Sequence, residues 1–177
     1  LEGLLKLRQI CDSPEILNDE ESYGNESIKI KELLNHITEK TGQHKILVFS
    51  QFVKMLRVIE RELKANDVNY EYLDGQSSQK SRRESVENFQ NNDDCRVFLI
   101  SIKAGGTGLN LTAADYVYIV DPWWNPAVEN QAIDRTHRIG QDKHIIAYRM
   151  ICKGTIEEKI MKLQAKKLRI ASDIIRT

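Results

Sequence analysis

The sequence VFLISIKAGGTGLNLTAADYVYIVD, residues 97–121, decides the fold class. It contains two short apolar runs, VFLI at 97–100 and YVYIV at 116–120, and a glycine-rich loop follows the first of them. Because both runs are apolar at consecutive positions, they are typical of strands that helices cover on both faces, as in a parallel sheet. This stretch therefore predicts two strands of one buried sheet, with a loop at the carboxyl end of the first.

Strands and helices alternate along the rest of the chain. The expected strands are Lys45–Phe49, Asn69–Leu73, Arg96–Ser101, Tyr116–Asp121 and His144–Ile151. The expected helices are Ser27–Lys40, Phe52–Asn66, Ser81–Asn91, Gln131–Ile139 and Thr155–Ile170. This alternation predicts a doubly wound α/β domain, in which ligands bind at the carboxyl ends of the strands.

The helical segments carry apolar stripes that indicate which face of each turns inward. Ser27 has the residue type of an N-cap and precedes the first stripe. The inward residues are expected to be Ile30, Leu33, Leu34 and Ile37, then Met55, Leu56, Ile59 and Leu63, then Val86 and Phe89, and finally Ile156, Ile160, Leu163, Lys167 and Ile170. A further short helix at 1–11 has leucines that need a partner surface and no start signal, so we expect the sequence to be part of a longer chain.

The composition suits a single folded domain. The chain has 177 residues, of which 41% are hydrophobic and 29% charged, which excludes collagen-like and wholly disordered proteins. No apolar run approaches the roughly 18 to 20 residues that a membrane span needs, and no signal segment is evident. Cys11, Cys95 and Cys152 form no ligand-spaced set with the histidines, so we expect reduced thiols in an intracellular compartment and no metal site.

The charges are unevenly placed. The formal net charge is +0, which argues against a strongly basic nucleic-acid module. Residues 12–26 hold six acidic residues and no lysine or arginine, which indicates an acidic loop, whereas residues 143–177 hold nine basic and three acidic residues. The neutral total therefore hides two patches of opposite sign.

The segment from Ser101 to Thr112, SIKAGGTGLNLT, holds three glycines within four positions directly after an expected strand. Glycine allows positive φ and close approach, so the backbone NH groups of such a loop can converge on a phosphate. A plain strand-to-helix turn is the alternative. The GxxxxGK[ST] pattern of a triphosphate-binding loop occurs nowhere in the chain, so the usual lysine-bearing cradle is missing.

The sequence QAIDRTHRIGQ, residues 131–141, places Gln131, Arg135 and Arg138 at i, i+4 and i+7, which share one face of a helix. Two guanidinium groups on that face can converge on one polyanion through charge-assisted hydrogen bonds. A solvent-exposed basic face is the ordinary alternative. His137 has no second ligand at useful spacing, so we expect it to pack rather than to bind metal.

Polar loops follow four of the five expected strands. DPWWNP, residues 121–126, has adjacent tryptophans, of which at least one is expected to face a partner. Ser50 and Gln51 follow the first strand, DGQSS at 74–78 follows the second, and the glycine loop follows the third. Because parallel strands end at the same edge of a sheet, these loops together predict a track for a phosphodiester backbone.

Four motifs resemble the second-lobe motifs of superfamily two helicases: FSQF, YLDGQSS, SIKAGGTGLNLTAADYVYIVDPWWNP and QAIDRTHRIGQ, in this order. DPWWNP and DRTHRIGQ resemble the Swi/Snf branch, and the likeness extends from LRQICDSPEIL to GTIEEKI, nearly the whole chain. The resemblance implies a RecA-like lobe that, paired with a first lobe, hydrolyses ATP and translocates along double-stranded DNA. The short carboxyl-terminal segment looks more like that of bacterial or archaeal members.

The resemblance also implies residue roles. Arg135 and Arg138 match arginine fingers, which stabilise charge on a transferred phosphoryl group, and Gln131 matches a glutamine that helps to close the nucleotide site. The positions that resemble DNA contacts are Ser50, Gln51, Gly75, Ser77, Lys103, Gly105, Gly106, Thr107, Asn110 and Thr112, with Trp123 and Trp124 near a DNA-coupling segment. ATP and Mg would be bound mainly by the first lobe, because this chain has neither the Walker A lysine nor the acidic magnesium-binding pair of that lobe.

The expected organisation has three parts: a linking helix and acidic loop at 1–26, the RecA-like lobe at 27–154, and a carboxyl-terminal helix at 155–177. The expected partners are double-stranded DNA, the amino-terminal RecA-like lobe of the same protein, and RNA polymerase or another DNA-bound protein, with no membrane. The location would be the cytoplasm (nucleoid) in a bacterium or archaeon and the nucleus in a eukaryote. Alone, the chain is expected to be inactive.

Two other functions remain open from the sequence. One is a stand-alone nucleic-acid or protein interaction module without ATPase activity. The other is the second lobe of an RNA helicase, which fits the glycine loop and the paired arginines but explains DPWWNP poorly. A GK[ST] loop and a DExx segment encoded upstream would favour the motor over the module.

Overall fold

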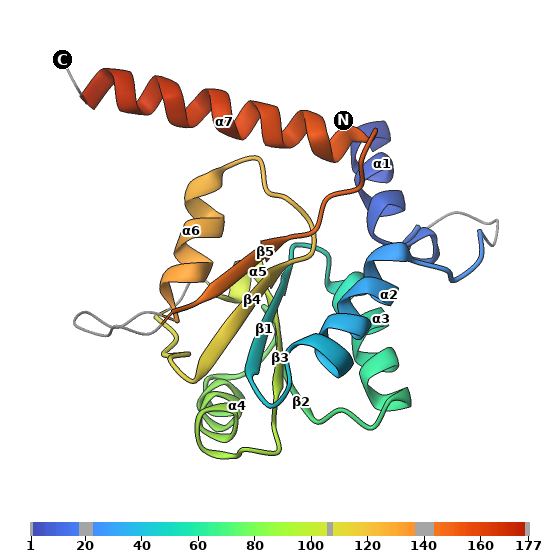
Figure 1. Cartoon of the computed structure of the whole chain (residues 1–177), viewed down its shortest axis with the longest axis vertical. Coiled ribbons are helices and arrows are strands. Elements are labelled where there is room, and N and C mark those ends of the chain that lie inside the picture. Colours follow the sequence, from blue (N-terminus) through green and yellow to red (C-terminus); the bar gives the residue numbers. More distant parts are fainter. Residues whose placement is uncertain (1, 18–22, 106–107, 137–143, 176–177) are drawn as a thin grey trace.

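The chain folds around a parallel sheet of five strands, as its computed structural model shows (Figure 1). The structure describes residues 2–17, 23–105, 108–136 and 144–175. The strand order is β2-β3-β1-β4-β5. The strands are β1 Lys45–Ser50, β2 Tyr70–Leu73, β3 Val97–Ser101, β4 Ala114–Ile119 and β5 Ile146–Arg149. The predicted doubly wound α/β fold is therefore confirmed, because all neighbouring strands pair in parallel.

The two central strands are buried from end to end. Every residue of β1 and β3 is buried, as their consecutive apolar residues predict. β1 lies between β3 and β4, so that Val48 is opposite Leu99 on one side and Tyr118 on the other. The edge strands differ, because β2 is mostly half-buried and all four residues of β5 are exposed.

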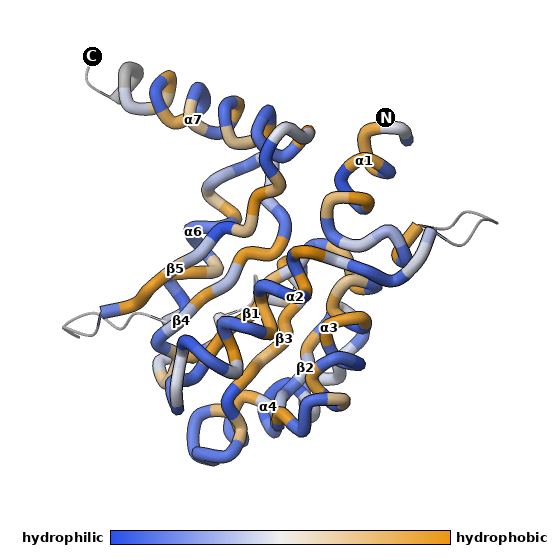
Figure 2. Tube along the Cα trace, turned by 45° about the vertical axis from the view of Figure 1, so that its right-hand side comes forward, coloured by the Kyte–Doolittle hydropathy of each residue, from blue (hydrophilic) through white to orange (hydrophobic). Residues whose placement is uncertain are grey.

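Helices cover both faces of the sheet. One face carries α2 (Ile28–Asn35), which continues into a π-helical turn at His36–Lys40, and α3 (Val53–Ala65). The other face carries α4 (Gln79–Asn91), the short α5 (Ile102–Gly105) and α6 (Pro126–Asp134). The inward residues predicted for α2, α3 and α4 lie in or against these two cores, which confirms the stripes. Figure 2 shows hydrophobic residues concentrated along the central strands.

The helix that carries the paired-arginine motif begins earlier than the sequence analysis predicts. The expected helix was Gln131–Ile139, whereas α6 runs from Pro126 to Asp134. The Asn125 side chain accepts a hydrogen bond from Ala127 N at 3.1 Å, and proline fills the first helical position, where a missing NH costs nothing. The prediction was wrong because it followed the charged face and overlooked this start signal.

Two helices from opposite ends of the chain meet at one end of the molecule (Figure 1). They are α1 (Glu2–Asp12), which a 3-10 turn at Pro14–Ile16 follows, and α7 (Ile156–Ile175). No described helix combines the length and the apolar character that crossing a membrane requires. The three cysteines are free thiols.

The inward face of α7 agrees with the predicted one at Ile160, which is buried, but differs further along the helix. Leu163 and Ile170 were expected to face inward, but they are 46% and 50% exposed. The buried residues of the described part of α7 are Glu157, Ile160 and Gln164. Two of these three are polar, and they hydrogen-bond to distant segments, so polar contacts rather than an apolar stripe orient this helix.

A buried lysine joins α1, α2, α7 and the end of β4. Lys29 is 3% exposed and donates from Nζ to Asp12 Oδ1 at 2.8 Å, to Glu157 Oε1 at 2.5 Å and to Val120 O at 2.7 Å. Burial opposes the charge of the amine, but the two carboxylates outweigh that effect and raise the pKa of Lys29. Burial, together with repulsion from Asp121, raises the pKa of Asp12. Lys29 thus fixes both terminal helices to the sheet.

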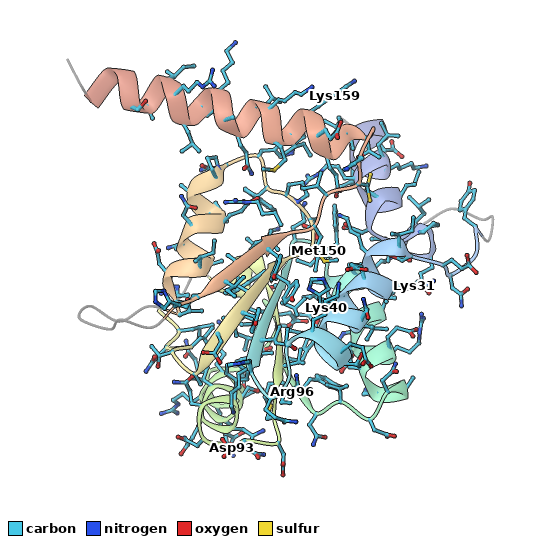
Figure 3. The ribbon with its side chains drawn as sticks, viewed as in Figure 1. Lys31, Lys40, Asp93, Arg96, Met150 and Lys159 are labelled. Carbon is cyan, nitrogen blue, oxygen red and sulfur yellow. The ribbon has the colours of Figure 1, made fainter. Side chains whose placement is uncertain are left out.

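We predict that Lys29→Ala lowers the free energy of unfolding by about 3 to 5 kcal/mol, because it leaves Asp12 and Glu157 buried without their cation. Lys31→Ala, on the exposed face of the same helix (Figure 3), is the matched control and should change that free energy by no more than about 0.5 kcal/mol. Urea unfolding followed by circular dichroism measures both. A loss below about 1 kcal/mol for Lys29→Ala would contradict the assigned role.

Candidate functional site

Asp121 ties the loop after β1 to the loop after β4. Ser50 is fully buried, and its hydroxyl donates a hydrogen bond to Asp121 Oδ2. Asp121 Oδ1 accepts a second hydrogen bond from Gln51 N at 3.0 Å. The FSQF and DPWWNP segments therefore lie together at the carboxyl edge of the sheet, as predicted. The Ser50 hydroxyl is bonded inside the fold, whereas Gln51 is partly exposed.

The loop after β2 is a hydrogen-bonded turn. Asp74 Oδ1 accepts a hydrogen bond from Gln76 N at 2.9 Å, and Asp74 N donates to Ser77 Oγ at 3.1 Å. Burial opposes ionisation, but the hydrogen bond from Gln76 and neighbouring donors outweigh it and hold the pKa of Asp74 below its usual value. Gly75 is exposed in this turn with open space around it, so a ligand can approach the backbone there.

Arg82 of α4 connects this turn to the glycine loop. Its Nη2 donates to Asp74 O at 3.3 Å, and its Nη1 donates to Ala104 O at 3.1 Å. The sequence analysis did not single out Arg82, and the one available signal was its place in the helix that follows DGQSS. This arginine sets the spacing of two loops that are predicted to contact DNA.

The glycine loop begins with a short helix. Ser101 Oγ accepts a hydrogen bond from Ala104 N at 3.3 Å, and α5 extends to Gly105. A Cβ on Gly105 would lie 3.1 Å from Phe49 Cε1, so glycine lets this backbone approach β1. Gly108 has a φ of +48°, the left-handed conformation that glycine adopts without strain.

The remaining positions of the glycine loop form a polar surface. Lys103 and Asn110 are exposed. Thr112 Oγ1 accepts a hydrogen bond from Gln90 Nε2 at 3.0 Å and donates to Asn110 Oδ1 at 3.1 Å, so α4 supports this part of the loop. Two predicted contact residues, Gly106 and Thr107, lie outside the described residues.

The end of α6 lies against the glycine loop. The backbone NH of Leu111 donates a hydrogen bond to Arg135 O at 3.1 Å. Arg135 is partly buried and caps the helix in right-handed helical geometry, so it keeps the predicted i, i+4 relation to Gln131. Gln131 is exposed beside a hollow of about 430 Å³. Arg138 and His137 lie outside the described residues, and the full arginine pair therefore stays a prediction.

The DPWWNP loop is held by α6 and α7. Trp123 N donates to Glu129 Oε1 at 2.8 Å, and Trp123 O accepts a hydrogen bond from Gln164 Nε2. Trp124 O accepts a hydrogen bond from Lys167 Nζ at 3.3 Å. Both tryptophans are partly buried, and Trp123 packs against one of the two cores. The structure thus brings the loop beside the loop after β1 but leaves both tryptophans partly exposed.

Glu129 is a buried acid at this junction that the sequence analysis missed. It is 0% exposed and also accepts hydrogen bonds from Gln164 Nε2 at 2.9 Å and from Arg149 Nε at 2.5 Å. The misplaced start of α6 put Glu129 outside the expected helix. A correct reading of the cap at Asn125 would have placed it in the first turn, facing the tryptophan loop.

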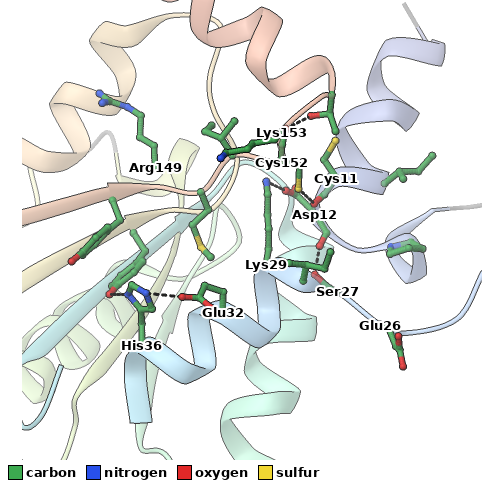
Figure 4. A pocket seen from close by; sticks show the side chains of 18 residues that line it. Cys11, Asp12, Glu26, Ser27, Lys29, Glu32, His36, Arg149, Cys152 and Lys153 are labelled. Atoms are coloured by element: carbon green, nitrogen blue, oxygen red, sulfur yellow. Dashed lines mark hydrogen bonds and ion pairs between the residues drawn. The ribbon is translucent and has the colours of Figure 1, made fainter. Parts of the chain in front are cut away.

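A separate cavity of about 720 Å³ lies between α1, α2 and the segment after β5 (Figure 4). His36 in its wall bonds to Tyr118 Oη through Nδ1 at 2.8 Å and to Glu32 Oε1 through Nε2 at 3.0 Å. Cys152 also lines it, and burial raises the pKa of this thiol to about 11, so it is protonated at neutral pH. The cavity shares no residue with the predicted site. Nowhere in the described residues do three His, Cys, Asp or Glu side chains form a possible metal site.

The sequence matches a known family and known proteins. Residues 28–140 match the family described as the helicase conserved C-terminal domain. The DNA repair protein rad8 of Schizosaccharomyces pombe is 43% identical over 145 residues, and an uncharacterized ATP-dependent helicase of Mycoplasma pneumoniae is 42% identical over 170 residues. These matches cover 80% and 96% of this chain but only 13% and 16% of the relatives, so the chain spans a small part of their length.

A solved structure supports the same assignment. The SWI2/SNF2 ATPase core of Sulfolobus solfataricus in complex with double-stranded DNA has a TM-score of 0.79 and 38% sequence identity to this chain. The comparison covers 98% of this chain and 37% of that chain. The family match spans more than half of the sequence, and the fold, the ordered motifs and this neighbour agree. The chain therefore belongs to the helicase conserved C-terminal domain family, within its Swi/Snf branch.

Proposed function

We propose that this chain is the second motor lobe of an ATP-dependent double-stranded DNA translocase or remodeller of the Swi/Snf type. The observation that carries the proposal is the 3.1 Å hydrogen bond from Leu111 N to Arg135 O. This bond joins the end of the helix that bears a predicted arginine finger to the loop that bears predicted DNA contacts. The contact places the two predicted half-sites next to each other, as a motor that couples hydrolysis to movement requires.

On the nucleotide side, we assign Arg135, Arg138 and Gln131 to contacts with ATP. When ATP is bound with Mg, it supplies the phosphoryl group that is transferred. Guanidinium donors opposite the triphosphate would stabilise the charge that develops on this group. The fit is that of half a site, because Arg135 and Gln131 offer donors but the described acidic residues form no metal-binding group. The chain also has no GK[ST] loop, so we assign the triphosphate cradle and the metal ligands to the first lobe.

On the DNA side, exposed groups of neighbouring loops face solvent at the strand ends. Gly75, Lys103 and Asn110 offer backbone NH groups, an amine and an amide. Such groups are usual donors to phosphate and sugar, so we propose that the lobe follows the DNA backbone and does not read bases. The hydroxyls of Ser50 and Ser77 are hydrogen-bonded within the fold and stabilise the loops after β1 and β2.

The proposed partners follow from the two half-sites. A first RecA-like lobe of the same protein would complete the nucleotide site, and double-stranded DNA would lie across both lobes. RNA polymerase or another DNA-bound protein would be the object that the motor moves. Fungal and bacterial proteins are both similar to this chain, so the location, nuclear or cytoplasmic, follows the source organism.

We predict that DNA-stimulated ATP hydrolysis requires both lobes. The chain alone should not hydrolyse ATP, because it lacks the groups that position the triphosphate. In the two-lobe protein, Arg135→Ala and Arg138→Ala should each lower kcat by on the order of 10³-fold and change DNA affinity by less than about threefold, since fingers act on transition-state charge. Steady-state ATPase assays and fluorescence anisotropy measure these quantities.

Arg61→Ala is the matched control for the two finger variants. Arg61 is an exposed arginine of α3 that pairs with Glu15 and Glu62, so its loss should leave kcat and DNA affinity unchanged. Normal turnover at saturating DNA, combined with weaker DNA binding, would reassign Arg135 and Arg138 to the DNA track. ATP turnover by the chain alone that disappears in Arg138→Ala would contradict the half-site.

We also predict that the chain alone binds DNA weakly and without sequence preference. Its formal net charge is +0, and neutral donors dominate the strand-end loops. The Kd for a DNA duplex should therefore be no tighter than about 10⁻⁴ to 10⁻⁶ M at physiological salt. Fluorescence anisotropy with several unrelated duplexes of equal length tests this. Nanomolar binding with a strong preference for one duplex would show that bases are read.

A further inference from the structure

Arg8 of α1 reaches from the edge of the domain into the junction of two strand-end loops. It is 6% exposed, and its Nη2 donates a hydrogen bond to Pro122 O at 2.9 Å. Pro122 belongs to the DPWWNP loop, which lies 114 residues further along the chain. Arg8 therefore joins the first helix to a loop that is distant in the sequence.

The Arg8 guanidinium also lies against one aromatic ring from each of the two loops. Its Cζ is 5.6 Å from the centroid of the Phe52 ring, in FSQF, and 5.4 Å from the centroid of the Trp124 ring, in DPWWNP. A cation that is shielded from water is attracted to aromatic faces more strongly than an exposed one. The same planar group thus holds both rings at a fixed separation.

Arg8 is also linked electrostatically to the FSQF loop, through the carboxylate of Asp121. Burial lowers the pKa of Arg8, and the carboxylate of Asp121 is the largest of the charges that oppose this shift. Asp121 is the acceptor for the Ser50 hydroxyl and for Gln51 N. Arg8 therefore contacts Phe52 and Trp124 directly and interacts electrostatically with the carboxylate that hydrogen-bonds to Ser50 and Gln51.

We propose that Arg8 is a positioning residue for DNA binding: it holds the Trp124 ring, next to Phe52 of the neighbouring loop, in the arrangement that receives the DNA backbone. This inference rests on the function proposed above. The alternative is that Arg8 only anchors α1 to the domain. An apolar side chain would do that without the cost of burying a charge, and a lysine would lack the planar group that lies against the rings.

The test uses the chain itself, with two readouts. In a Trp123→Phe background Trp124 is the only tryptophan, so its emission and its quenching by acrylamide report on the ring beside Arg8. Fluorescence anisotropy with a labelled duplex, in the native background, reports DNA affinity. The variants are Arg8→Met, which keeps bulk but removes the charge, and Arg8→Lys, which keeps the charge but removes the planar group.

Arg96→Met is the matched control. Arg96 also donates from Nη2 to a distant backbone carbonyl, Ile37 O at 3.1 Å, and burial likewise lowers its pKa. It precedes β3, so it lies at the opposite end of the sheet from the strand-end loops (Figure 3). Its loss should destabilise the fold as the loss of a partly buried, hydrogen-bonded arginine does, without moving Trp124 or changing DNA affinity.

We expect Arg8→Met to shift Trp124 emission to longer wavelength, to raise its quenching about twofold and to weaken DNA binding about five- to tenfold. Arg8→Lys should recover part of both changes, and Arg96→Met should show neither. If Arg8→Met does not fold by circular dichroism, the shifts of Arg8→Lys relative to the native chain decide the question.

Unchanged Trp124 emission and DNA affinity would overturn the inference, and so would equal effects of Arg8→Met and Arg96→Met. A shift in Trp124 emission with native DNA affinity would also overturn it, because the loops would then be held for another purpose. If the native chain alone bound no duplex, which its predicted weak affinity allows, the DNA affinities of Arg8→Met and Arg96→Met in the two-lobe protein decide the inference. A two-lobe protein that bound no duplex would instead contradict the proposed function.

Discussion

The contact of one buried lysine with two carboxylates is the constraint on which the arrangement of this lobe depends. Lys29, Asp12 and Glu157 come from three helices, and Lys29 and Glu157 are 128 residues apart in the chain. A lone buried charge is strongly unfavourable, so each of the three groups requires the others in place. With α1 and α7 held in this way, Arg8 and Gln164 reach the tryptophan loop from two sides. The positions of the strand-end loops therefore depend on the buried ion pairs of Lys29 with Asp12 and Glu157.

The fold and the outline of the site could be predicted from the sequence because both depend on local patterns. Runs such as VFLI and YVYIV specify strands that are buried on both faces, and the loops that follow them share one edge by the geometry of parallel strands. The same reasoning predicts that Ser50 and Gln51 lie beside the DPWWNP loop, and both hydrogen-bond to its Asp121. Their order along the chain was sufficient for this.

The groups that hold the site together could not be predicted, since each acts over a long sequence distance. Arg8, Lys29 and Gln164 look like ordinary surface residues of amphipathic helices, and only the folded chain shows that they are buried. The prediction that Leu163 and Ile170 of α7 face inward was wrong for the same reason. Polar partners in other elements, and not the apolar period of the helix, determine its orientation. Glu129 differs, since Asn125 and Pro126 were visible signals of the helix start that places it.

The exposed edge strand has a consequence for local unfolding. β5 pairs with β4, and all four of its residues are exposed, so its amides should be among the first of the sheet to exchange hydrogen with solvent. Its last residue, Arg149, is bonded to the buried carboxylate of Glu129, which also accepts the hydrogen bond from Trp123 N. When β5 opens, that carboxylate loses its cation, and the tryptophan loop loses a support. The least protected strand of the sheet is therefore the one whose fluctuations reach the strand-end loops.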